Sequence, residues 1–137
     1  LYYLSYGDGT VSTIGAFVNP LLCWGGLLAL PVLAYRAWKR DRTALFLLVG
    51  YLAQVLPWVF ISRLTFEYHY FAATLFLVLA LGYVFDRLRR RGYLGIVYAF
   101  TAANGVLFAL FYPVLTGVTI PRDYAWNVLK WLPDWPF

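Results

Sequence analysis

The residues best suited to binding chemistry gather in one short stretch, residues 61–70, which reads ISRLTFEYHY. In a helix that begins just before them, Arg63, Glu67 and Tyr70 follow an i, i+4, i+7 spacing and share one face. The arginine guanidinium can bond two phosphate oxygens, and the carboxylate beside it can hold it in place. His69, elsewhere on the same turn, can donate a hydrogen bond to the same anion. These four residues are therefore candidates for an anion-binding site.

The same spacing has a second interpretation, which needs no ligand. Arg63 and Glu67 can form a simple ion pair at the mouth of the apolar run that follows, while His69 and the tyrosines reach toward water. Polar groups at the entrance of an apolar segment are costly to dehydrate, which favours a binding site. From spacing alone, the two interpretations stay equally open.

No complete catalytic set accompanies these residues. The chain has one histidine and one cysteine, Cys23, and it contains no Gly-x-Ser-x-Gly turn, no phosphate-binding glycine motif and no close pair of carboxylates. The GDG run at Gly7–Gly9 is too short for phosphates and predicts a turn. One cysteine and one histidine also exclude a thiolate cage or a histidine-rich metal site. We expect no catalytic residue, no metal and no cofactor in this segment.

The composition places these candidates in a membrane protein. Hydrophobic residues make up 63% of the 137 and charged residues only 12%, whereas soluble domains average roughly half and a quarter. Four apolar segments, each near the length that crosses a bilayer as a helix, are expected at residues 17–35, 44–60, 70–85 and 93–112. The predicted fold is an all-α membrane protein with four transmembrane helices in a single region, and its first partner is the lipid bilayer.

Charge predicts the orientation of the four helices. Eight of the eleven basic residues lie in two short loops, 36–42 and 87–91, and such loops face the cytoplasm in most membrane proteins. The loop 61–69 and the C-terminus are then exoplasmic. A role of the basic loops as anionic lipid sites is the less favoured alternative. The net charge of +5 therefore indicates topology, and nucleic acid is not an expected partner.

The tail, residues 113–137, differs from the spans. It holds Trp126, Trp131 and Trp135 among four prolines, which suits the headgroup region and prevents one continuous helix. We expect it to lie on the exoplasmic surface. The chain begins at Leu1 without a methionine or a signal-peptide pattern, so we expect it to be a piece of a longer polypeptide, with a small processed protein as the alternative.

Three motifs in order carry a family resemblance. Asn19-Pro20 followed by Trp24, then SRLTFEYHYFAATLFL, then YPVLTGVTIP with a tryptophan-rich ending, together resemble the C-terminal four-span region of the protein O-mannosyltransferases, most closely their bacterial branch. These are the dolichyl- or polyprenyl-phosphate-mannose-dependent enzymes of glycosyltransferase family 39. The resemblance implies a GT-C fold, a polyprenyl-phosphate-mannose donor and transfer of mannose, with inversion, to Ser or Thr of exported proteins. The acceptor-activating carboxylate lies in the family's first exoplasmic loop, upstream of this segment.

The resemblance also assigns residues. The family's Arg-x-Thr-aromatic segment maps onto Arg63 to Tyr70, with Tyr68 where the eukaryotic branch often has a second histidine. It implies that Arg63, Glu67, His69 and Tyr70 lie beside the donor phosphate on the exoplasmic side. The segment would then supply scaffold and donor contacts to a larger enzyme and would be inactive alone.

Two other functions are compatible with the same sequence features. A non-enzymatic four-span protein, packing against another membrane subunit, fits the glycines and the incomplete catalytic set. A transporter fragment, with Arg63, Glu67 and Gln54 along a substrate path, fits less well, because transporters carry ionisable residues in mid-span and here they gather at interfaces.

Overall fold

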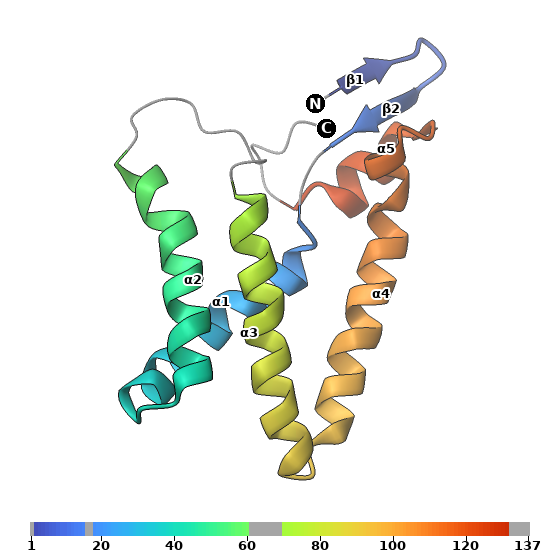
Figure 1. Cartoon of the computed structure of the whole chain (residues 1–137). Coiled ribbons are helices and arrows are strands. Elements are labelled where there is room, and N and C mark those ends of the chain that lie inside the picture. The colour runs from blue at the N-terminus through green and yellow to red at the C-terminus, as the bar shows by residue number, and fades with distance from the viewer. Residues whose placement is uncertain (1, 16–17, 61–69, 132–137) are drawn as a thin grey trace. The chain divides into compact units, whose positions relative to one another are not determined.

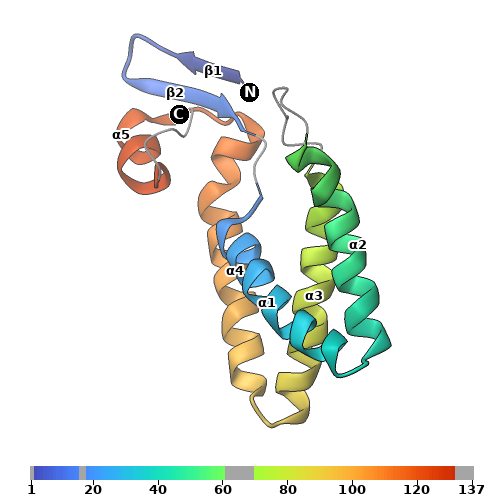
Figure 2. The ribbon, with the colours of Figure 1, turned by 90° about the vertical axis from the view of Figure 1, so that its left-hand side faces the viewer.

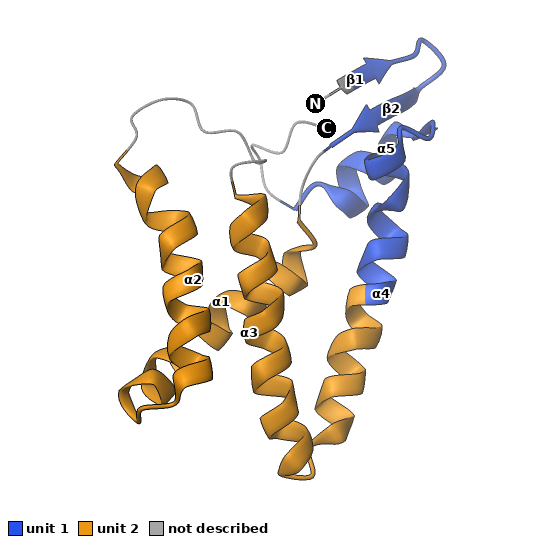
Figure 3. Ribbon diagram, viewed as in Figure 1, with its two compact units in different colours: residues 1–17, 105–137 blue, residues 18–104 orange. Residues whose placement is uncertain are grey.

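A computed structural model describes residues 2–15, 18–60 and 70–131 of the chain. The chain divides into two compact units, one formed by Val18–Asn104 and the other by Leu1–Phe17 together with Gly105–Phe137 (Figure 3). Each unit has its own buried hydrophobic residues.

The larger unit contains the helices α1 (Pro20–Trp38), α2 (Arg42–Val59) and α3 (Phe71–Arg90) and the first part of α4 (Leu94–Thr116) (Figure 1). All four helices are long and apolar enough to cross a membrane, with mean hydropathy of 1.4 to 1.9. The expectation of four membrane-spanning helices is confirmed. Three of them run further into the basic loops than expected, because α2 begins at Arg42, α1 includes Arg36 and α3 continues to Arg90. Basic side chains in a last turn favour the extension of α1 and α3, since they interact well with the helix dipole.

Small residues allow α1, α2 and α3 to pack closely. The buried core between them contains Ala29, Leu33, Ala44, Leu47, Ala80 and Leu81. A Cβ added at Gly26 of α1 would lie 2.7 Å from the Leu77 Cβ of α3, and one at Gly50 of α2 would clash with the Phe76 ring. The glycines therefore let the helix backbones approach one another, as is common in membranes.

The turn between α1 and α2 is tied to α3 by one carboxylate. Asp41 caps α2 by accepting hydrogen bonds from the amides of Thr43 and Ala44 at 3.1 and 3.2 Å. Its other oxygen accepts hydrogen bonds from the Tyr83 hydroxyl and the Arg87 guanidinium, each at 2.6 Å. These contacts, the Tyr83 hydrogen bond above all, hold the pKa of Asp41 below its ordinary value. The α1–α2 turn and the α3–α4 turn accordingly lie at the same end of the larger unit (Figure 2).

The smaller unit contains a three-stranded antiparallel sheet in the order β1 (Tyr2–Ser5), β2 (Thr10–Ile14), β3 (Ile120–Pro121). In its register, Tyr2 faces Ile14 and Val11 faces Ile120. The expected turn at Gly7–Gly9 is confirmed: Gly9 has a φ of +82°, and the Asp8 carboxylate accepts hydrogen bonds from the amide and hydroxyl of Thr10. The sheet itself was not expected from the sequence.

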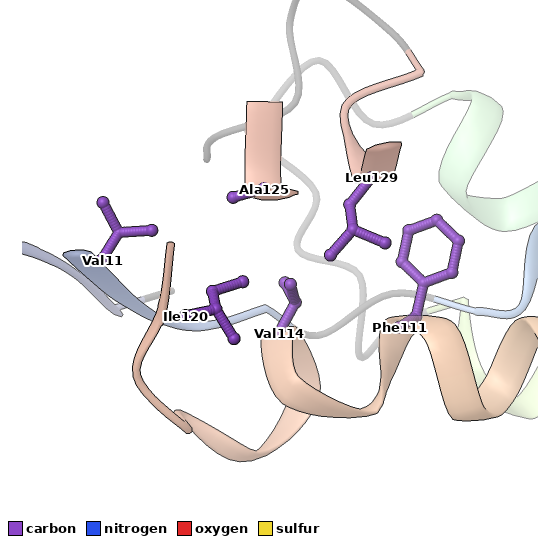
Figure 4. Packing of buried hydrophobic residues seen from close by; sticks show 6 residues of the cluster. All are labelled: Val11, Phe111, Val114, Ile120, Ala125 and Leu129. Carbon is purple, nitrogen blue, oxygen red and sulfur yellow. The ribbon is translucent and has the colours of Figure 1, made fainter. Parts of the chain in front are cut away.

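The tail adds two short helical turns to this sheet. α4 continues through Pro113 to Thr116, and β3 is followed by α5 (Arg122–Tyr124) and the π-helical turn η2 (Ala125–Leu129). Their apolar side chains meet β2 in one cluster, formed by Val11, Phe111, Val114, Ile120, Ala125 and Leu129 (Figure 4). Residues 113–131 thus form a packed structure that is in part helical. The fourth helix crosses the expected boundary at residue 113 and ends at Thr116, and the expectation that the tail is not one continuous helix agrees with the breaks that follow.

Close packing at Gly26 predicts a stability difference between two glycine substitutions. Gly26→Ala inserts a methyl group against Leu77 and should lower the free energy of unfolding by about 1 to 3 kcal/mol. Gly82→Ala is the matched control, because nothing lies within 4 Å of a Cβ at this position in α3. Denaturation in detergent, followed by circular dichroism, measures both. Equal stability of the two variants would contradict the close approach of α1 and α3.

Candidate functional site

The structure describes one of the four predicted site residues. Arg63, Glu67 and His69 lie outside the described residues, and Tyr70 stands at the N-cap of α3. Their assignment to an anion site therefore stays a prediction. What the structure adds is the environment of Tyr70, the residue that immediately follows them in the chain.

Tyr70 is anchored to α2 through its hydroxyl group. The hydroxyl oxygens of Tyr70 and Tyr51 are 3.0 Å apart, and Tyr51 is only 7% exposed. Around this pair lie Ala73, Leu77 and Val55, so the two hydroxyls form a polar contact inside an apolar cluster. A hydroxyl can donate one hydrogen bond and accept two. The Tyr70–Tyr51 pair uses one such contact and leaves capacity for another group.

The backbone at the start of α3 is also held. The Thr74 hydroxyl donates a hydrogen bond to the Tyr70 carbonyl at 3.2 Å, and the Thr74 amide donates one to the same carbonyl at 3.1 Å. Tyr70 is therefore held at the start of α3 twice, through its side chain by Tyr51 and through its carbonyl by Thr74. Tyr51 was missed by the sequence reasoning, because a tyrosine within an apolar segment gives no local signal that its hydroxyl meets another helix.

The structure explains the Asn19-Pro20 motif as the start of α1. Its Oδ1 accepts hydrogen bonds from the amides of Leu21 and Leu22 at 3.1 and 3.4 Å, so Asn19 is the N-cap of α1, and Pro20 follows at the first helical position. Its Nδ2 donates to the Asn104 carbonyl of α4 at 3.1 Å. One side chain therefore both starts α1 and links it to α4 within the larger unit.

Asn104 takes part in the link between α1 and α4 through its main-chain carbonyl. The Asn104 side-chain nitrogen donates to the Phe100 carbonyl of its own helix at 2.9 Å. The side-chain oxygen of Asn104 is buried and has no hydrogen-bond partner in the described part of the chain. The cross-helix contact comes from Asn19, which donates to the main-chain carbonyl.

The third motif, YPVLTGVTIP, organises the smaller unit. The Val114 carbonyl accepts a hydrogen bond from the Gly15 amide at 3.0 Å, and the Gly117 carbonyl accepts one from the Ser12 hydroxyl at 2.7 Å. Gly117 has a φ of +75°, a conformation that suits glycine after the end of a helix. Ile120 then enters the sheet beside Val11. These residues hold β2 against the end of α4.

The tail carries aromatic and basic contacts. The Arg122 and Lys130 side chains both lie 4.8 Å from the centre of the Trp126 ring, and Trp131 meets Phe111 edge-on at 5.4 Å. Over residues 2–15, 18–60 and 70–131, no group of three His, Cys, Asp or Glu side chains could hold a metal ion. The aromatic contacts suit a membrane interface.

Comparison with known proteins identifies the family. Residues 10–135 match the family described as the C-terminal four TMM region of protein-O-mannosyltransferase. A polyprenol-phosphate-mannose–protein mannosyltransferase of Mycobacterium tuberculosis is 37% identical over 132 residues, which cover 85% of this chain and 24% of the relative. One from Mycolicibacterium smegmatis is 33% identical over 125 residues, covering 79% of this chain and 23% of the relative.

The chain therefore spans about a quarter of the length of these relatives. No solved structure gives a significant match. The resemblance read from the three motifs is confirmed by the family match, which covers each of them.

The two roles of Asn19 can be separated by substitution. Asn19→Ser keeps an N-cap acceptor but is too short to reach the Asn104 carbonyl, so it should lower the free energy of unfolding by about 0.5 to 1.5 kcal/mol. Asn19→Ala also loses the cap and should cost about 1 kcal/mol more. Chemical denaturation in detergent compares both with the unaltered chain. If Asn19→Ser is as stable as the unaltered chain, the link to α4 contributes nothing.

Proposed function

We propose that this chain forms part of a membrane enzyme that moves mannose from polyprenyl-phosphate mannose to Ser or Thr of exported proteins. The chain belongs to the protein O-mannosyltransferase family, as its C-terminal four-transmembrane region. The names of the relatives, polyprenol-phosphate-mannose–protein mannosyltransferases, support the donor and the protein acceptor. The segment would contribute scaffold and donor contacts.

The observation that carries the donor role is the anchoring of Tyr70. Its hydroxyl contact with Tyr51 and the bonds from Thr74 to its carbonyl fix the residue that follows the other three candidates in the chain. Tyr70 directly follows His69 in the chain, so holding Tyr70 in place would lower the conformational entropy lost when these neighbouring residues bind the donor. We place the donor phosphate beside Arg63, His69 and Tyr70, with Glu67 orienting the arginine.

The proposed chemistry explains why a cation belongs there. During transfer, the bond between the sugar carbon and the phosphate oxygen breaks while a bond to the acceptor hydroxyl forms, and the polyprenyl phosphate departs with added negative charge. A guanidinium beside that phosphate stabilises the charge as it develops. The acceptor hydroxyl must lose its proton to a base. This segment has no complete catalytic set, so we assign that base to another part of the enzyme.

Removing the arginine should weaken the donor site in a complete enzyme that carries this segment. We expect Arg63→Ala to raise the donor KM or lower kcat by about tenfold or more, because a charge-assisted hydrogen bond to phosphate contributes about 1.5 to 3 kcal/mol. Arg122→Ala is the matched control, since Arg122 lies in the tail against Trp126. Mannosyl transfer to an acceptor peptide, titrated with donor, measures both variants.

Two results would contradict this proposal. If Arg63→Ala and Arg122→Ala have the same donor kinetics as the unaltered enzyme, Arg63 does not contact the donor. If the purified 137-residue chain transfers mannose by itself, the base lies within this segment. The second result would overturn the assignment of the base to another part of the enzyme, but it would not change the family membership.

We also propose that the basic loops face the cytoplasm. The loops 36–42 and 87–91 hold most of the basic residues, and α1 to α4 place both at one end of the larger unit. The end of α2 and the start of α3 lie at the opposite end, which would face the compartment where exported proteins receive mannose. The positive-inside bias supports this orientation.

Cysteine labelling tests the orientation. In a Cys23→Ala background, a membrane-impermeant maleimide should label Gly7→Cys in intact cells and Lys39→Cys only after permeabilisation. Gly7 suits this use, because nothing lies within 4 Å of its added Cβ. The reverse labelling pattern would refute the proposed orientation.

A further inference from the structure

A groove of about 410 Å³ lies between the last turns of α1 and α3 in the larger unit. One part of its lining is apolar and comes from Val32, Tyr35, Val84 and Leu88. The rest is cationic and comes from Arg36, Arg87 and Arg91. A second hollow of about 420 Å³ shares these three arginines and adds Asp86 and Arg90. The arginines of two helices thus converge on one place at the ends of the spans.

The carboxylates at this end are already engaged. Asp41 forms an ion pair with Arg87 at 2.6 Å, and Asp86 pairs with Arg89 at 3.2 Å and Arg90 at 2.8 Å. Among the described residues, Arg36 and Arg91 have no carboxylate within ion-pair distance. The groove therefore presents two guanidinium groups that form no ion pair with a carboxylate of the described residues.

Topology alone does not require this arrangement. The positive-inside bias depends on the number of basic residues in a loop, and helix dipoles favour any cation in a last turn. Neither effect calls for arginines from two helices around a shared hollow with an apolar wall. Lys39 and Arg42 belong to the same basic loop, and neither lines either hollow. Only some of the basic residues at this end of the helices therefore line the groove.

We propose that this groove binds the phosphate headgroup of an anionic phospholipid. The planar guanidinium groups of Arg36 and Arg91 match the oxygens of a phosphodiester, which they can bond in pairs. Val32, Val84 and Leu88 belong to membrane-spanning helices, so they offer the glycerol and upper acyl region an apolar surface at headgroup depth. A soluble phosphate could also bind the arginines, but it has no apolar part that would contact Val32, Val84 and Leu88.

Lipid binding to the full 137-residue chain tests the proposal. Native mass spectrometry in detergent would compare phosphatidylglycerol with phosphatidylcholine of the same acyl chains. We expect the chain to prefer phosphatidylglycerol, and Arg36→Gln with Arg91→Gln to weaken its binding by about tenfold. The matched control, Lys39→Gln with Arg42→Gln, removes the same charge outside the groove and should weaken it by less than about twofold.

The remaining arms of the experiment distinguish the alternatives. Arg36→Lys with Arg91→Lys keeps both charges but loses the paired guanidinium bonds, so it should bind phosphatidylglycerol more weakly than the unaltered chain and more tightly than the glutamine variant. Circular dichroism of the glutamine variant should match that of the unaltered chain, which separates lost binding from misfolding. If the two glutamine double variants weaken phosphatidylglycerol binding equally, the lipid is attracted by surface charge in general, and the groove is not its binding site. Displacement of phosphatidylglycerol by millimolar inorganic phosphate would mean a site for small anions and would overturn the lipid assignment.

Discussion

The larger unit depends on the carboxylate of Asp41. One of its oxygens starts α2 by accepting two backbone amides, and the other receives the Tyr83 hydroxyl and the Arg87 guanidinium from α3. The α1–α2 turn is short, so fixing Asp41 also fixes where α1 must end. The contact is partly exposed, with 24% of the Asp41 side chain accessible, and its geometry matters more than its strength as an ion pair. Around it, the two basic loops come to share one end of the helices.

The four helices could be predicted from the sequence, because each is a long apolar run between charged or polar residues and a membrane leaves the backbone few other choices. Their ends were less predictable. Arg36 and Arg90 looked like loop residues, yet both extend helices whose last turns favour cations. Asp41 stood in a basic loop and gave no sign that it would meet Tyr83, more than forty residues later in the chain.

The sheet could not be read from local pattern. Its third strand is two residues long, Ile120–Pro121, and its partner begins at Thr10. No periodicity develops over two residues, and the pairing depends on Gly117 turning the chain back after α4. Of the candidate site, sequence reasoning supplied Tyr70 but could not supply Tyr51, since the contact of their hydroxyls exists only when α2 and α3 pack side by side.

The pairing of β2 with β3 has a consequence for biosynthesis. Thr10 and Val11 leave the ribosome near the start of translation of this segment, whereas Ile120 and Pro121 emerge only after all four helices have been made. The cluster around Val11 likewise waits for Phe111, Val114 and Leu129. The helices can therefore enter the bilayer one after another, but the sheet cannot be completed until the last span has been synthesised. The sheet is therefore completed late, and only in a chain in which the whole segment has been synthesised.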